Sequence, residues 1–212
     1  MILFNKKIEN RLQTKLKASK TGLFLSRFQP IHNGHLYVIE KMCEECDEVY
    51  ICIGSSNKCK SLRNPLPIKE REMFVRKALE ERGLNIEKVH VIQLPDWSME
   101  SKTDENKLWG KYLYFNVVSE MQKKYFTIYY SDNPKYIEKW FKSEIKKYVF
   151  IKSLKRDNIA NGISATKIRE ALLNENYEYV KENCPKCVYD YRESLHVRLK
   201  LIADNPKDDY SM

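Results

Sequence analysis

The sequence of 212 residues has no uninterrupted apolar stretch of the roughly 18 residues that a membrane-spanning helix requires. It also lacks a secretory signal, because its first apolar run, Met1–Phe4, is far too short. Internal repeats, low-complexity segments and linkers that would divide the chain are absent as well. These absences predict one folded domain in the cytoplasm, without a membrane span.

The six cysteines do not form the pattern of a small, loop-rich disulfide scaffold. They lie in apolar runs, which favours a reducing, cytosolic setting. Two pairs, Cys43/Cys46 and Cys184/Cys187, have the spacing of zinc ligands. Cys43 and Cys46, however, continue the apolar face of a predicted helix, where a thiol acts as a small hydrophobic side chain. We therefore expect packing rather than a metal site.

Positive charge exceeds negative charge, with 38 Lys and Arg against 29 Asp and Glu and a formal net charge of +9. This excess suits an acidic partner, either nucleic acid or a small phosphorylated substrate. Residues 1–20 form a basic extension in which Ile8, Leu12 and Leu16 predict an amphipathic helix. Such a helix could pack on its own domain, or bind a membrane surface or a partner. Residues 203–212 are polar, and we expect a disordered tail.

From residue 21 onward, short apolar segments alternate with helical patterns. Strands are expected at 22–25, 48–53, 88–94, 126–130 and 148–153, and helices after residue 35 and at 69–82, 107–124, 134–147 and 164–173. Such alternation predicts an α/β fold, a Rossmann-like parallel sheet flanked by helices, with a C-terminal helical extension. The expected domain spans residues 21–202. Ligands of such sheets bind at the carboxyl ends of the strands.

The ten residues Ser26–His35 join the first predicted strand to the first predicted helix. At such a junction, unpaired backbone N–H groups and the positive end of the helix dipole point at a bound anion. Pro30 stiffens the turn, and Gly34 lets the backbone approach a ligand closely. The imidazoles of His32 and His35 could donate hydrogen bonds to phosphate. A metal site is the alternative reading of an H-x-x-H pair, but no carboxylate or cysteine lies beside it.

A second cluster, Gly162–Arg169, follows the last predicted strand. Ser164 can cap the helix that begins there, and Thr166, Lys167 and Arg169 fall in its first turn. Cations at a helix N-terminus oppose the dipole, which indicates that an anion normally binds there. An ordinary helix start with solvated charges is the alternative.

A third and weaker cluster, Gly54–Asn57, ends the second predicted strand. Its glycine and hydroxyl groups can hydrogen-bond the base or the phosphates of a nucleotide. Arg71, on the next predicted helix, could face the same crevice.

In this order, the motifs RFQPxHxGH, GSS, NPxxxxER, YSxNP and ISxTxIR resemble those of the nucleotidylyltransferase superfamily. Within it, the chain resembles the archaeal-type nicotinamide-nucleotide adenylyltransferases, over about residues 22–188. The resemblance implies transfer of the AMP part of ATP to nicotinamide mononucleotide, which gives NAD and pyrophosphate. ATP and nicotinamide mononucleotide are then the expected partners, and Mg²⁺ bound with ATP is the expected cofactor.

The resemblance also implies roles for individual residues around ATP. His32, His35 and Arg169 would form the catalytic set that contacts the phosphates and neutralises their charge. Further ATP contacts are implied for Arg27, Phe28, Gln29, Pro30, Gly34, Arg71, Asn133, Ile163, Ser164 and Thr166. No residue of the chain is expected to bind a metal directly.

For the nicotinamide nucleotide, the resemblance implies contacts from Gly54, Ser55, Asp96, Asn106 and Trp109. Trp109 would stack on the pyridinium ring, a cation–π contact worth about 1–2 kcal/mol when desolvated. Asn106 would meet the carboxamide. The polar connection 98–107 is expected to be a loop, longer than usual in the family, and Trp97 could take the stacking role. A buried, structural Trp109 is the other reading.

Three departures from the family pattern replace glycine. Ser26 precedes Arg27, Asp132 stands inside the YSxNP motif, and Ala165 lies between Ser164 and Thr166. Ser26 narrows the approach of the backbone to the ligand, but the small side chains of Ser26 and Ala165 do not block a phosphate site. Because Asp132 replaces glycine in its motif, Asn133 is the residue there to which the family role is carried over.

Two other functions fit part of these observations. Inside the superfamily, adenylylation of phosphopantetheine or FMN, or cytidylyl transfer to an alcohol phosphate, would use the same phosphate site. In another class, a non-catalytic basic module that binds nucleotides or nucleic acid would account for the charge. The predicted phosphate contacts cluster at strand ends instead of along an exposed face, so we expect no stable nucleic-acid complex. Nicotinamide and nicotinate nucleotides both fit the sequence, as does a homo-oligomer.

Overall fold

The computed structural model describes residues 20–96, 105–131, 137–141, 144–154, 162–206 and 210–211. For residues 105–107 and 210–211 it describes the backbone alone. The predicted N-terminal extension lies outside these ranges apart from Lys20, and so do Trp97, Asp132 and Asn133.

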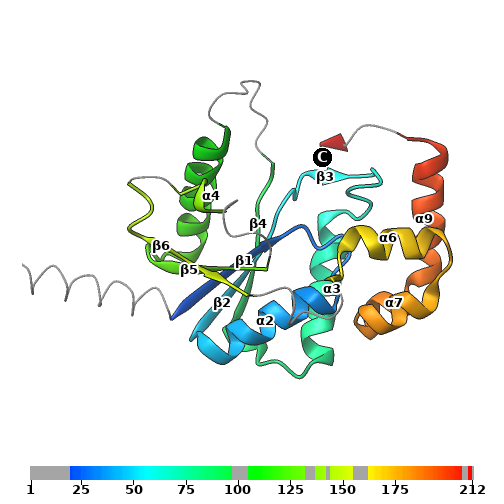
Figure 1. The fold of residues 1–212 in the computed structure, drawn as a ribbon, viewed down its shortest axis with the longest axis horizontal. Helices are drawn as coiled ribbons and strands as arrows, with labels where there is room; N and C mark the ends of the chain where they lie inside the picture. Colours follow the sequence, from blue (N-terminus) through cyan, green and yellow to red (C-terminus); the bar gives the residue numbers. More distant parts are fainter. Residues whose placement is uncertain are drawn as a thin grey trace, which may run out of the picture.

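A five-stranded parallel sheet forms the centre of the molecule (Figure 1). Its strands are β1 (Thr21–Ser26), β2 (Glu48–Ile53), β4 (Val89–Gln93), β5 (Phe126–Tyr130) and β6 (Val149–Ser153). The order is β4-β2-β1-β5-β6, and every neighbouring pair is parallel. The winding direction therefore reverses beside β1, and the carboxyl end of β1 is the switch point where ligands of such sheets bind. The predicted Rossmann-like sheet is confirmed.

Helices cover both faces of the sheet because its strands are apolar on both sides. The helices are α2 (Asn33–Glu45), α3 (Ile68–Glu81), α4 (Glu105–Met121), α6 (Ala165–Leu173), α7 (Tyr177–Asn183), α8 (Lys186–Asp190) and α9 (Arg192–Asp204), with a 3₁₀ turn η1 (Ile86–Lys88). On β1, Phe24 packs in the core under α2 and α3, whereas Leu23 packs in a second core under α4. None of the helices in the described part of the chain combines the length and the apolar character that a bilayer crossing demands.

The C-terminal helices form the predicted helical extension. They lie beside α3, and α6 leads the chain from the strand edge into this group (Figure 1). Cys184 and Cys187 are buried in the same core as Cys46, while Cys43 packs partly buried against it. The expectation that Cys43 and Cys46 pack in the core is confirmed.

Of the predicted helix at 134–147, the structure confirms only Ile137 and Glu138 among the residues that it describes there. Beyond Glu138, residues 139–141 and 144–147 form turns and bends. Ile137, Phe141 and Ile145 are all buried on the α4 side of the sheet. Their four-residue spacing imitates a helical face, and this spacing misled the prediction. The predicted loop 98–107 is also shorter at its end, because α4 already begins at Glu105.

The tail predicted to be disordered from residue 203 is ordered where it is described. Helix α9 continues to Asp204, and β7 (Tyr210–Ser211) pairs antiparallel with β3 (Lys58–Cys59). A polar composition does not prevent this pairing, because its hydrogen bonds come from the backbone.

Candidate active site

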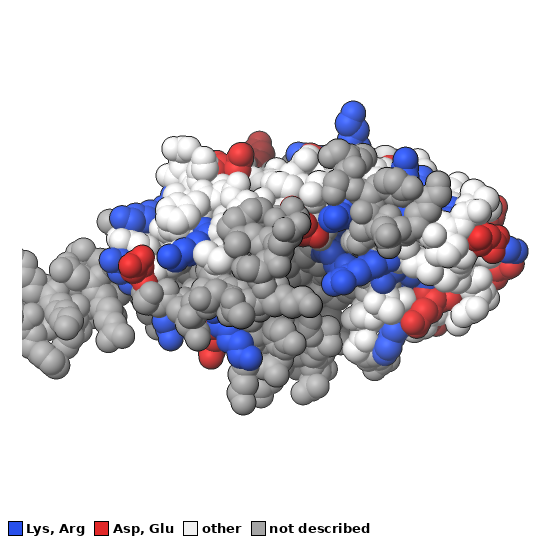
Figure 2. Space-filling model, turned by 90° about the horizontal axis from the view of Figure 1, so that it is seen from above, with Lys and Arg blue, Asp and Glu red and all other residues white. Residues whose placement is uncertain are grey.

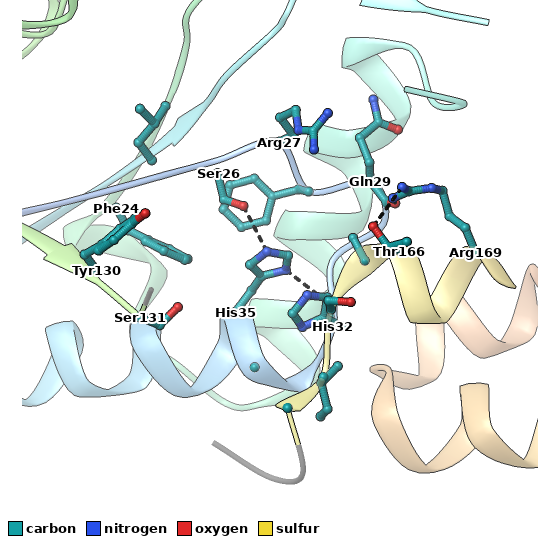
Figure 3. Close-up of a pocket in the computed structure, with 17 residues that line it drawn as sticks. Phe24, Ser26, Arg27, Gln29, His32, His35, Tyr130, Ser131, Thr166 and Arg169 are labelled. Atoms are coloured by element: carbon teal, nitrogen blue, oxygen red, sulfur yellow. Dashed lines mark hydrogen bonds between the residues drawn. The ribbon is translucent and has the colours of Figure 1, made fainter. Parts of the chain in front are cut away.

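A cavity of about 220 Å³ opens at the carboxyl end of β1 (Figure 3). The end of β1 and the start of α2, the end of β5, and the start of α6 form its walls. Residues predicted from the sequence that line it are Arg27, Phe28, Gln29, His32, Gly34, His35, Ile163, Ser164, Thr166 and Arg169. The histidine motif and the late ISxTxIR motif therefore meet around one cavity.

The two histidines lie at the N-terminus of α2, where His32 is the N-cap residue. Their rings stack at a centroid distance of 3.7 Å. His35 is 9% exposed, and its Nδ1 accepts a hydrogen bond from the backbone N–H of His32 at 3.3 Å. Its Nε2 lies 2.9 Å from Oγ of Ser26. Burial, assisted by the charge of His32, lowers the pKa of His35 well below its ordinary value of 6.5. His35 is consequently neutral at pH 7.

Arg169, in the first turns of α6, links the two motifs. Its guanidinium donates to the carbonyl of Gln29 at 2.9 Å and to Oγ1 of Thr166 at 3.2 Å. Burial lowers the pKa of Arg169 to about 10, so the group stays cationic at neutral pH. Ser164 caps α6 as predicted, because its side chain accepts from the backbone N–H of Lys167.

Other cations surround Arg169. Arg27 lines the cavity and donates to Oδ1 of Asn64 at 3.4 Å. The charges of Arg27 and the exposed Arg63 both contribute to lowering the pKa of Arg169. Figure 2 shows Lys and Arg side chains gathered near the middle of the face seen from above. Clustered like charges repel one another, which favours an anionic ligand at this place. The sequence did not point to Arg63. The one feature that marks this residue is its position directly before the Asn-Pro of the motif NPxxxxER.

Arg71 does not line the cavity in this structure, and its contact with ATP stays a prediction. It is 0% exposed, and its guanidinium donates to the carbonyls of Arg27, Gly54 and Ser55 at 3.1, 2.8 and 2.9 Å. Burial lowers the pKa of Arg71 to about 10. The buried guanidinium satisfies backbone groups of two loops and thereby ties the loop after β1 to the loop after β2.

Three predicted nicotinamide-nucleotide residues lie together beside the cavity, at the carboxyl ends of β2 and β4. Gly54 donates its N–H to the carbonyl of Ser26 at 2.9 Å. Ser55 donates its hydroxyl to Asp96 at 3.0 Å. Asn57 joins the same group, because its side chain accepts from the N–H of Asp96 at 2.7 Å. The carboxylate of Asp96 is thus held in a fixed position.

Trp109 lies on α4 and is half-buried against Tyr112, at 5.5 Å, and Trp140, at 6.4 Å. Tyr112 donates to the carbonyl of Pro95 at 2.9 Å, which fixes α4 against the end of β4. Trp109 is therefore held by aromatic neighbours near Asp96, and its stacking on a substrate stays a prediction.

The remaining predicted residues are placed less completely. Asn106 lies in the first turn of α4, with only its backbone described, and Asn133 is outside the described residues. Pro30 is buried and does not contribute to the cavity wall. Cavity residues that the sequence reasoning did not assign are Phe24, Leu25, Ser26, Tyr130, Ser131, Gly162 and Ala165. Four of them lie in the carboxyl-terminal halves of β1 and β5, and the other three lie just after β5 or around the start of α6. A place near a strand end or a helix start is the one signal that could have found them.

The cavity wall has the chemistry of a phosphate site. It carries the hydroxyls of Ser26, Ser164 and Thr166, the cation of Arg169 and the N-termini of two helices. Its described lining residues include no Asp or Glu. Across the part of the chain that is described, no group of three or more His, Cys, Asp or Glu could hold a metal ion by itself.

Comparison with known proteins gives consistent matches. Residues 23–171 match the cytidylyltransferase-like family. The nicotinamide-nucleotide adenylyltransferase of Thermococcus sibiricus is 32% identical over 184 residues, which are 86% of this chain and 89% of that protein. That of Thermococcus kodakarensis is 34% identical over 189 residues, 88% of this chain and 90% of that protein.

Solved structures share the fold. The bifunctional NMN adenylyltransferase/ADP ribose pyrophosphatase from Francisella tularensis, complexed with AMP and a Mn ion, has a TM-score of 0.58 at 22% identity. The match covers 74% of this chain and 42% of that one, so this chain spans less than half of the bifunctional protein. Plasmodium falciparum nicotinic acid mononucleotide adenylyltransferase complexed with NaAD has a TM-score of 0.50 at 16% identity. This match covers 84% of this chain and 96% of that one.

Proposed function

This chain belongs to the cytidylyltransferase-like family, among the nicotinamide-nucleotide adenylyltransferases, and on this premise we propose that it transfers AMP from ATP to nicotinamide mononucleotide, giving NAD and pyrophosphate. One observation carries the proposal. His32, His35, Thr166 and Arg169 come from distant parts of the chain and line one cavity at the N-termini of two helices. That arrangement supports the binding of a triphosphate tail.

The reaction is an in-line displacement at the α-phosphorus of ATP. The 5′-phosphate of nicotinamide mononucleotide is largely dianionic at pH 7, because the second pKa of a phosphomonoester is about 6. It therefore attacks without a general base. A new P–O bond forms, the bond to pyrophosphate breaks, and negative charge develops on the leaving group. Catalysis then requires alignment of the two substrates and neutralisation of this charge.

The chain's own residues supply both requirements. Arg169 is already oriented by Gln29 and Thr166, so little reorganisation is needed when the charge develops. The hydroxyls of Ser164 and Thr166 and the first N–H groups of α6 act on the same phosphates. His32 and His35 contribute at the start of α2, and His35 acts as a neutral hydrogen-bond donor because its pKa is lowered.

Mg²⁺ is proposed to enter as the ATP complex. The cavity offers hydroxyls, amides and a guanidinium, which bind phosphate, so phosphate oxygens and water would supply the metal's main ligands. When bound, the ion would neutralise part of the charge on the β- and γ-phosphates.

We assign the nicotinamide nucleotide to the adjoining strand ends. Gly54, Ser55 and Asp96 form a hydrogen-bonded group next to the ATP cavity, with Trp109 on the neighbouring helix. Asn106 precedes Trp109 by one helical turn on α4. Their arrangement supports a second substrate lying between β2, β4 and α4. The free thiols of all six cysteines support a reducing compartment, and we propose the cytoplasm.

The test is to incubate the protein with ATP, Mg²⁺ and nicotinamide mononucleotide and to measure NAD and pyrophosphate. We expect both products in equal amounts. Parallel reactions replace the second substrate with phosphopantetheine, FMN or an alcohol phosphate with CTP, and faster pyrophosphate release from one of these would reassign the substrate. RNA binding without any pyrophosphate release would instead favour a non-catalytic module.

A further inference from the structure

Ser26 is the last residue of β1. Its side chain lines the phosphate cavity, and its Oγ lies 2.9 Å from Nε2 of His35 (Figure 3). A glycine at this position would have no group to offer His35. The hydroxyl of Ser26 therefore makes a contact with the predicted catalytic set that the sequence alone does not reveal.

The direction of this hydrogen bond follows from the other side of the ring. Nδ1 of His35 faces the backbone N–H of His32, which can only donate. Nδ1 must therefore accept and carries no proton. The proton of the neutral imidazole is then on Nε2, and this N–H donates to Oγ of Ser26.

His35 itself presents little to the cavity. It is 9% exposed, its ring stacks on that of His32 and packs against that of Phe28, and both of its nitrogens are engaged. A hydroxyl has one O–H donor in addition to its acceptor lone pairs. When Oγ of Ser26 accepts from His35, the hydroxyl proton of Ser26 is left for another acceptor, on the side where Ser26 borders the cavity.

We propose that Ser26 contacts a phosphate of ATP and that His35 acts through it, in the order His35 Nε2–H to Ser26 Oγ–H to phosphate oxygen. The imidazole polarises the hydroxyl, which strengthens the bond that Ser26 donates to the anion. This inference rests on the proposed function, because it assigns ATP to the cavity. It makes Ser26 a binding residue of this chain and the acceptor for the Nε2 proton of His35.

Four variants test this relay. Ser26→Ala and Ser26→Gly remove the hydroxyl, whereas Ser26→Thr keeps it. Ser119→Ala makes the same chemical change at an exposed position on α4 and serves as the matched control. We expect the Ala and Gly variants to lose about 10- to 100-fold in kcat/KM, the range for a hydrogen bond to a charged group. The Thr variant and the control should retain most of the activity, and thermal unfolding should show all four folded.

A double-mutant cycle of Ser26→Ala with His35→Ala measures the coupling between the two residues, which a purely structural role of Ser26 would not produce. If His35 acts through Ser26, the loss caused by Ser26→Ala largely disappears when His35 is already Ala. If the fold-losses in kcat/KM of the two single variants multiply in the double variant, the relay is wrong. An unchanged or higher kcat/KM in Ser26→Gly would also overturn the relay, because it would mean that His35 reaches the phosphate directly.

Calorimetric titration with Mg·ATP alone separates this inference from the proposed function. Wild-type protein that makes no NAD would end the proposed transfer reaction. Weaker ATP binding by Ser26→Ala than by Ser119→Ala would still support the Ser26 contact, and equal binding together with equal turnover would overturn it.

Discussion

Two hydrogen bonds hold the guanidinium of Arg169 between the two motifs. Arg169→Ala should lower kcat by about 10²–10³-fold, the usual cost of removing one preorganised donor to a developing negative charge. Steady-state measurement of NAD formation checks this. Exposed Arg76→Ala, on α3, is the matched control and should keep full activity. Near-normal turnover of Arg169→Ala would remove the residue from the catalytic set.

His35 also makes stability depend on pH. Its pKa in the folded chain lies well below 6.5, so between these two values the unfolded chain binds a proton that the folded chain does not. The contribution of His35 to stability is therefore complete above about pH 6.5 and is lost as the pH falls toward the depressed pKa. Urea unfolding from about pH 8 to pH 5 should show a steeper decline for wild type than for His35→Gln.

Ser119→Ala, at an exposed position on α4 and without a titratable group, is the control for this measurement and should follow the wild-type curve. Identical pH dependence of wild type and His35→Gln would contradict the assignment of the low pKa to His35.

At the residue scale, the motifs predicted which side chains meet but not how each is used. Arg71 is the clearest case. Its charge predicted a phosphate contact, but the groups it binds are backbone carbonyls of two loops. Every residue carries a carbonyl, so no pattern of side chains can reveal such acceptors. The contact between Ser26 and His35 was hidden for a related reason, because it depends on the ring orientation that the N–H of His32 fixes.

At the scale of the elements, Gly110 makes α4 sensitive to a single methyl group. A Cβ at this position would lie 1.9 Å from the carbonyl oxygen of Trp140, which is backbone and cannot rotate away. Gly→Ala in a helix ordinarily stabilises by about 1 kcal/mol. Here we expect the opposite sign, a loss of about 1–3 kcal/mol through overpacking, with displacement of the neighbouring Trp109.

Thermal and urea unfolding of Gly110→Ala measure this loss, and the KM for nicotinamide mononucleotide reports the displacement of Trp109. Ser119→Ala on the same helix should be neutral or slightly stabilising, because its side chain is exposed and Ala has the higher helix propensity. A stabilised Gly110→Ala variant would show that the helix and Trp140 separate easily.

Strands and helices were predictable to different degrees. β2 and β5 have the bounds that were predicted from their apolar runs, since strands buried on both faces need no alternation. The turns near 139–147 were not predictable, because buried side chains at four-residue spacing arise from a helix or from turns lying on a sheet. The strand β7 was missed because a run of two residues is too short to carry a strand pattern of its own.

At the scale of the whole molecule, the sequence predicted the parallel sheet and the meeting of distant motifs, because the alternation of strands and helices restricts the topology and aligns the strand ends. It did not predict how the charge is distributed. The net charge of +9 allows either a dispersed basic surface or a local site. The structure places Arg27 and Arg63 close enough to Arg169 to lower its pKa, which favours a local site.

This distribution predicts how turnover responds to salt. Raising NaCl from about 50 mM to about 500 mM shortens the Debye length to a few ångströms and weakens the attraction of exposed arginines for a polyanion. We expect kcat/KM for ATP to fall several-fold, mainly through KM, because Arg169 is buried and less screened. Arg63→Gln should show a higher KM at low salt and a shallower salt dependence. Lys186→Gln removes one positive charge from α8, where Lys186 pairs with Asp190. This variant should keep the wild-type slope of kcat/KM for ATP against salt concentration. Equal slopes for Arg63→Gln and Lys186→Gln would mean that the overall charge of the molecule, and not the arginines beside the cavity, attracts the nucleotide.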